Sequence, residues 1–336
     1  MTQAPPPGVP LWRRPLVRIA GSVIILTLLV VALPFHDLIE ALRRMPMWVW
    51  PLALVSYLML HLIGIAKWRL VTNTAGAGMT FRVAARAYYA GLFGNTFLPS
   101  IVGGDVVRAG VALPAVRSKS ALVLGSLVDR VGDIVSLGAV AAIGAVLSPR
   151  ALDASSRAVF VSLGVMLAVA GLVGLLLITR FPVRRLSFKV RRKLVHVRRA
   201  LRATAQRPQA IVMAIAMGML LQALLVVLNY VLGLTIGIDI PLYVWLFVWP
   251  LAKISGLAPL TQGGIGVREA AQVVLFAPFG VPGAMALAVG LVFEAIIIVG
   301  GLLGGAIAFA LGRGDGAPSL RSYTLSPPLA DLRDKG

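Results

Sequence analysis

Nine ionisable residues lie within strongly apolar stretches of this sequence, and they are its main candidates for chemistry. A charge at the centre of a bilayer costs at least about 2.5–3.5 kcal/mol, so such residues pair with one another, face a water-filled cavity, or do both. Four are basic and five are acidic, so the group has a net charge of minus one. Its members are Asp105, Arg108, Asp129, Arg130, Asp133, Lys253, Arg268, Glu269 and Glu294.

The spacing of these residues allows two interpretations. Asp129 and Asp133 are four residues apart and share one face of a predicted helix, where Arg130 can also reach Asp133. The cluster is then either a set of buried ion pairs that joins helices or part of a transport site. In a transport site, the carboxylates would balance a cationic head-group or carry protons, and Arg108 and Arg268 would receive phosphate.

Two further polar residues are weaker candidates. Asn95 is either a lining residue of the same site or an amide that caps or packs a helix, and Lys253 has the least support of the nine charges. The chain has no cysteine and only three scattered histidines. Disulfides, thiolate nucleophiles and cysteine-based metal sites are therefore excluded. We expect no histidine-based metal centre, and no catalytic residue, cofactor or other metal.

A short motif occurs twice. The first copy reads Pro99-Ser-Ile-Val-Gly103-Gly104-Asp105-Val-Val-Arg108, and the second reads Pro259-Leu-Thr-Gln-Gly263-Gly264-Ile-Gly266-Val-Arg268. Proline ends an incoming helix, and Gly-Gly permits a tight return and close packing of neighbouring helices, so each copy predicts the turn of a re-entrant helical hairpin. The alternative is that the motif only packs helices and that its arginine extends to the membrane surface. The two hairpins are expected at Val83–Pro114 and Tyr243–Phe276. Their predicted turn residues are Pro99, Gly103, Gly104, Pro259, Gly263, Gly264 and Gly266.

Long apolar stretches predict the helices that surround these hairpins. A helix needs about 20 apolar residues to cross a bilayer. Six stretches satisfy this requirement, and the first has no cleavage pattern after it, so we expect it to remain as an anchor. The predicted spans are Val17–Leu33, Met47–Ala66, Ser120–Leu147, Ala158–Thr179, Pro208–Ile236 and Ala284–Leu311.

Each hairpin is flanked by two spans, which gives two repeats, 47–147 and 208–311, within a transmembrane domain at 17–311. The positions of the basic loops place the first hairpin on the cytoplasmic side and the second on the outer side, so the repeats are expected to be inverted. Inverted repeats with broken helices form the central sites of many transporters. The second half-helix of each hairpin would offer free N–H groups and a positive dipole end to an anion.

Composition and charge agree with a membrane protein. Of 336 residues, 59% are hydrophobic and 13% charged, and the mean hydropathy is +0.91. A soluble domain has about 25% charged residues, so an ordinary soluble fold is excluded. The net charge of +20 comes mainly from basic residues beside apolar spans, which marks cytoplasmic loops rather than a nucleic-acid surface. Both termini are therefore expected in the cytoplasm, as segments 1–16 and 312–336, the latter disordered.

Residues 180–207 contain eleven basic residues, no acidic residue and apolar positions at helical spacing. This pattern predicts an amphipathic cytoplasmic helix that binds anionic lipids of the inner leaflet. The alternative is that the segment only sets the topology and has no ligand.

These residues resemble a known family. The stretch Asn95-Thr-Phe-Leu-Pro99, the Gly103-Gly104-Asp105 sequence with Arg108, the Asp129-Arg130 pair and the second motif through Glu269 are similar to the lysylphosphatidylglycerol synthase transmembrane family of flippase-like proteins. The resemblance covers roughly residues 15–312. It implies a multi-pass protein of a bacterial or archaeal inner membrane. Relatives include the flippase half of multiple peptide resistance factors and proteins of hopanoid and glycolipid pathways.

The resemblance favours a flippase or head-group transporter for a membrane phospholipid or lipid-linked substrate in the bacterial inner membrane. We expect no soluble acyltransferase domain, because the chain ends soon after the last span, and hence no aminoacylation of lipid. Two alternatives stay open: a membrane-embedded glycosyl- or acyl-transferase, and a non-catalytic partner in a lipid pathway. The sequence does not indicate the lipid, the energy coupling or the oligomeric state.

Overall fold

The computed structural model of the chain describes residues 15–98, 103–147, 206–256, 261 and 263–313, and these residues form helices without any strand. Four helices are long and apolar enough to cross a membrane. They are α3 (Val49–Thr74), α6 (Lys119–Leu147), α9 (Pro208–Ile236) and α12 (Gly283–Gly312). A pair bent by 97°, α1 (Pro15–Ala32) and α2 (Phe35–Arg44), counts as a fifth span if it is taken as one. The prediction of an all-α, multi-pass membrane protein is confirmed.

Of the five predicted spans within the described residues, four agree with a helix to within two residues at each end and one does not. The first, predicted as Val17–Leu33, is α1. Helix α9 begins and ends as predicted, and α6 and α12 differ by single residues at their ends. Helix α3 does not stop at Ala66 but continues to Thr74, which places Lys67 inside the helix rather than in a cytoplasmic loop. The predicted boundary was wrong because the span was ended at its first charge. The predicted span Ala158–Thr179 and most of the basic segment 180–207 lie outside the described residues.

Each predicted hairpin corresponds to a pair of shorter helices. The first pair is α4 (Phe81–Phe97) and α5 (Gly103–Ala112), and the second is α10 (Leu242–Ser255) and α11 (Val267–Phe276). Each pair is followed by a short 3₁₀ helix, η2 (Leu113–Ala115) or η4 (Ala277–Phe279), and then by a long helix. The order of long helix, helix pair, 3₁₀ helix and long helix therefore occurs twice in the described chain.

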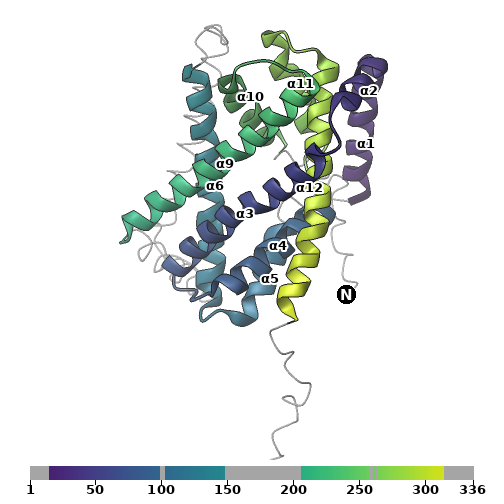
Figure 1. Cartoon of the computed structure of the whole chain (residues 1–336). Helices are drawn as coiled ribbons and strands as arrows, with labels where there is room; N and C mark the ends of the chain where they lie inside the picture. Colours follow the sequence, from purple (N-terminus) through teal and green to yellow (C-terminus); the bar gives the residue numbers. More distant parts are fainter. Residues whose placement is uncertain (1–14, 99–102, 148–205, 257–260, 262, 314–336) are drawn as a thin grey trace, which may run out of the picture.

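The two helix pairs lie at different ends of the bundle, as Figure 1 shows with α4 and α5 at the bottom and α10 and α11 at the top. The first pair begins where α12 ends, because Arg82 Nη2 donates to the carbonyl of Leu311 at 3.1 Å. The end of α9, which precedes the second pair, approaches α2 near Arg44.

Further arginines gather where the first pair begins. Arg69 Nε donates to the carbonyl of Met79 at 3.1 Å, and the backbone N–H of Arg117 donates to the carbonyl of Ala77 at 2.9 Å. A Cβ on Gly312 would lie 2.9 Å from the Arg86 guanidinium.

Glycines bring the two helices of each pair into contact. A Cβ on Gly104 would lie 2.1 Å from Asn95 Oδ1 and 2.4 Å from the carbonyl oxygen of Gly91, so α5 lies directly against α4. Gly103 and Gly104 are already in the first turn of α5, so they give the close packing expected of them rather than the return itself. In the second pair, the glycines at 263, 264 and 266 do form a turn with positive φ of 61°, 83° and 90°. Pro99 and Pro259 lie outside the described residues.

The long helix that follows each helix pair contacts the helix pair of the other half. A Cβ on Gly144 of α6 would lie 2.4 Å from the backbone nitrogen of Phe247, so α6 contacts the backbone of α10. Likewise, a Cβ on Gly304 of α12 would lie 3.0 Å from the carbonyl oxygen of Tyr89 in α4. Helices α3 and α9 pack against each other. These contacts between the two halves enclose the polar residues of the candidate site.

Candidate functional site

A cavity of about 240 Å³ lies between the two helix pairs, with walls from α3, α6, α9 and α12. Seven of the nine residues predicted to bind substrate line it, and the other two, Asp129 and Glu269, contact lining residues. The lining members are Asn95, Asp105, Arg108, Arg130, Asp133, Arg268 and Glu294. The structure thus brings residues from both sequence motifs to one place.

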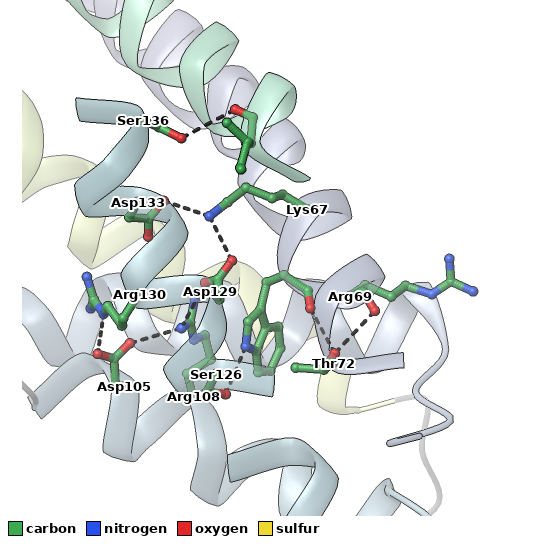
Figure 2. A network of polar contacts seen from close by, with 12 residues as sticks. Lys67, Arg69, Thr72, Asp105, Arg108, Ser126, Asp129, Arg130, Asp133 and Ser136 are labelled. Atoms are coloured by element: carbon green, nitrogen blue, oxygen red, sulfur yellow. Dashed lines mark hydrogen bonds and ion pairs between the residues drawn. The ribbon is translucent and has the colours of Figure 1, made fainter. Parts of the chain in front are cut away.

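The first charged cluster connects α5 to α6 (Figure 2). Asp105 accepts from Arg130 Nε at 2.5 Å and from Arg108 Nη2 at 3.0 Å. Arg108 Nη2 also lies 3.4 Å from Asp129 Oδ2. The guanidinium of Arg108 lies 4.6 Å from the centroid of the Trp68 ring, which covers the charge with an aromatic face.

Lys67 completes this cluster, although the predicted span Met47–Ala66 ended one residue before it. Its Nζ lies 2.7 Å from Asp129 Oδ1 and 2.6 Å from Asp133 Oδ1, and the residue is 3% exposed (Figure 2). The lysine therefore joins α3 to α6 in the interior of the bundle. A signal for it was present in the sequence, because the excess of carboxylates over basic residues in the apolar stretches required another cation. With Lys67 included, the first cluster has three cations and three carboxylates.

The second charged cluster connects α11 to α12. Arg268 Nη2 donates to Glu269 Oε1 at 2.9 Å and also contacts the Glu294 carboxylate. Glu269 is fully buried, and its Oε2 accepts the backbone N–H of Gly266 at 2.6 Å. A carboxylate of the chain itself therefore occupies the N-terminus of α11. This arrangement corrects the expectation that the helix offers free N–H groups to an anion.

The helices also correct the expected equivalence of the two arginines. Arg108 is in the second turn of α5, whereas Arg268 is the second residue of α11. The residues that share the third position of these helices are Asp105 and Glu269. The difference arises because the second pair has a turn at Gly263–Gly266 before α11, whereas the corresponding Gly-Gly of the first pair is already helical.

Neutral polar groups complete the site. Asn95 Oδ1 accepts the backbone N–H of Gly104 at 3.1 Å, so this amide joins the end of α4 to the start of α5 while it lines the cavity. Asn95 therefore joins the two helices and faces the cavity at the same time. On the other side, Lys253 Nζ donates to Gln222 Oε1 at 2.9 Å. Among the described residues, no group of three histidines or carboxylates could hold a metal ion.

The charges in and around the cavity balance. The nine charged residues predicted from the sequence have a net charge of minus one. With Lys67 included, the ten residues have a net charge of zero. Arginine and carboxylate pairs are suited to electrostatic recognition and to breakable contacts between helices. The arrangement offers no activated nucleophile among the described residues. It is a polar, charge-balanced chamber inside apolar helices.

Comparison with known proteins gives one finding. The family described as "Lysylphosphatidylglycerol synthase TM region" matches residues 16–305, which include every described helix of the bundle except the first residue of α1 and the end of α12. The resemblance inferred from the motifs is confirmed. No curated protein matches the chain.

Proposed function

The chain belongs to the lysylphosphatidylglycerol synthase TM region family, and from this premise we propose that it is a flippase-like transporter of a phospholipid or lipid-linked head-group. The membrane would be the inner membrane of a bacterium. The family supports a role with lipids, and the transport role is our inference from the site.

The observation that carries this proposal is the polar cavity between the two helix pairs. A cavity of about 240 Å³ is smaller than the roughly 300–1,000 Å³ of sites that enclose drug-sized ligands, so it suits a lipid head-group with the acyl chains left outside. Ten charged residues at or beside this cavity would be costly in an apolar bundle without a function. A passage for a polar head-group provides that function.

The mechanism we propose is alternating access between inverted repeats. Three features support it: the order of elements occurs twice, the helix pairs lie at different ends of the bundle, and each long helix packs on the pair of the other half. In transporters with such repeats, one repeat rocks against the other around a central site. The head-group would enter the cavity from one side and leave from the other.

The ion pairs would act as gates in this mechanism. Asp105 with Arg130 joins the first helix pair to α6, and Arg268 with Glu294 joins the second pair to α12. A movement of either pair away from its long helix must break these contacts. A charged head-group can replace the lost partner, which would couple substrate binding to opening.

The topology completes the proposal. We place both termini in the cytoplasm and expect the basic segment 180–207 to bind anionic lipids of the inner leaflet. No enzymatic step is included, because the described cavity has no nucleophile with an adjacent base.

Reconstitution in liposomes tests the proposal. Vesicles would contain trace amounts of fluorescent phosphatidylglycerol, phosphatidylethanolamine and lysyl-phosphatidylglycerol, and the accessible label would be quenched from outside. We expect at least one lipid to cross faster than in vesicles without protein. If every lipid crosses at the same rate as in vesicles without protein, transport is contradicted. A change in the mass of the lipids would instead indicate a transferase.

A further inference from the structure

We infer that Lys253 is the residue that binds the phosphate of the head-group, in place of the arginines that the motifs favour; this inference rests on the proposed function. Lys253 is in the last turn of α10 and lines the cavity. Among the described residues, it is the cation of the site that has no carboxylate within ion-pair distance. Its direct polar partner is neutral, the amide oxygen of Gln222 at 2.9 Å.

The arginines of the cavity are already compensated. Arg108 contacts two carboxylates, and Arg130 contacts Asp105. Arg268 contacts both Glu269 and Glu294, so its cluster has a net charge of minus one and repels a phosphate. A phosphate at any of these arginines would lie beside a carboxylate that already balances the arginine charge, whereas Lys253 has no carboxylate within ion-pair distance in the described structure.

The surroundings of Lys253 hold the ammonium group in the cavity without neutralising it. Its Nζ lies 4.8 Å from the centroid of the Trp249 ring, and this ring packs edge-on against Phe293 at 5.7 Å. A cation above an aromatic face gains about 0.5–2 kcal/mol, which is less than the cost of an unpaired charge in a bilayer. An anionic ligand would supply the remaining stabilisation.

A second group in the same cavity, the imidazole of His61, has a nitrogen without a hydrogen-bond partner among the described residues. His61 of α3 lines the cavity, is 7% exposed, and has a buried Nδ1 without a hydrogen-bond partner in the described structure. Its ring is fixed by Tyr57 at 4.4 Å and Tyr88 at 5.8 Å between centroids. A buried polar atom without a partner is costly, and a phosphate or hydroxyl of a head-group would satisfy it. Within the part of the chain that the structure describes, the cavity thus has a cation without a carboxylate partner and a polar atom without a hydrogen-bond partner for such a ligand.

Binding can be measured without transport, because Trp249 is adjacent to Lys253. Purified full-length protein in neutral detergent would be titrated with short-chain dihexanoyl phosphatidylglycerol while tryptophan emission is recorded. We expect a saturable change in the wild type that is absent in Trp249→Phe. Lys253→Gln should raise the apparent Kd about ten- to hundred-fold, the range expected for a lost hydrogen bond to a charged group. Lys253→Arg should bind within a few-fold of the wild type.

Controls separate this inference from a structural role and from the proposed function. Lys119→Gln, at an exposed lysine at the start of α6, should bind as the wild type does. Melting temperatures of the Lys253 variants identify any that fail to fold. If Lys253→Gln fails to fold, the affinity of Lys253→Arg for the lipid decides whether the site is correct. If Lys253→Gln binds as tightly as the wild type, the phosphate site is wrong. If binding depends on Lys253 but no lipid crosses in liposomes, the site stands and the transport function fails.

Discussion

At the scale of single residues, the main result is that buried charges form two clusters and leave one lysine uncompensated. The carboxylates and arginines were identifiable from the sequence because each interrupts an apolar stretch. Lys67 was missed because it lies near the end of such a stretch, where a charge normally marks the membrane boundary. Whether a charge is inside or outside depends on how far the helix continues. That length is set by packing: Trp68 is fully buried, and Lys67 is paired with carboxylates of α6.

The Lys67 pairs give a prediction about stability. Lys67→Met leaves Asp129 and Asp133 without their ammonium partner, and breaking a buried ion pair costs about 3–5 kcal/mol. We expect a clear fall in the melting temperature in detergent. The double variant Lys67→Met with Asp133→Leu restores equal numbers of cations and carboxylates in the cluster, and it should recover much of the loss. A double variant less stable than Lys67→Met would contradict the charge-balance account.

At the scale of elements, close backbone contacts position the cavity. The motif copies correctly predicted where the helix pairs occur. The sequence could not show that the first Gly-Gly packs α5 on α4 while the second set of glycines forms a turn. Both patterns contain the same residue types, and only the neighbouring helices decide between packing and turning. The crosswise contacts of α6 with α10 and of α12 with α4 were not predictable either, because they join segments far apart in the chain.

Two glycines of α6 allow a matched test of this packing. Gly144→Ala places a Cβ 2.4 Å from the backbone nitrogen of Phe247, and overpacking of this kind costs about 1–3 kcal/mol. Gly138→Ala in the same helix meets nothing within 4 Å and should stabilise the helix by up to about 1 kcal/mol. We expect the melting temperature to fall for the first variant and not for the second. Equal effects would show that α6 does not lie directly on α10.

At the scale of the whole molecule, the charge distribution and the apolar stretches were sufficient to predict a multi-pass helical protein. The grouping of Arg69, Arg82 and Arg117 near the start of α4 agrees with the proposed cytoplasmic side, and Arg44 approaches the end of α9 at the other end of the bundle. The sequence predicted most of the charged residues at the cavity but not the cavity itself. Its size and its uncompensated cation depend on which pairs form, and spacing along a helix does not determine contacts between helices.

The absence of cysteine from the sequence makes the topology easy to test. Ser120→Cys lies at the start of α6, at the arginine-rich end, and Asp239→Cys lies after α9, at the other end; both positions are exposed. A membrane-impermeant maleimide added to intact spheroplasts should label Asp239→Cys and leave Ser120→Cys unlabelled until the membrane is permeabilised. The opposite pattern would invert the proposed orientation.

The central claim is that a lipid head-group crosses the membrane through the cavity, and obstruction of the cavity tests it most directly. Ile297 lines the cavity from α12, and Val299 of the same helix is exposed on the outer surface of the bundle. Ile297→Cys and Val299→Cys would be reconstituted in liposomes and treated with a bulky thiol reagent, and lipid transfer would be measured before and after. We predict that the reagent stops transfer by Ile297→Cys and leaves Val299→Cys and the wild type unaffected. Continued transfer by fully labelled Ile297→Cys would contradict passage through this cavity.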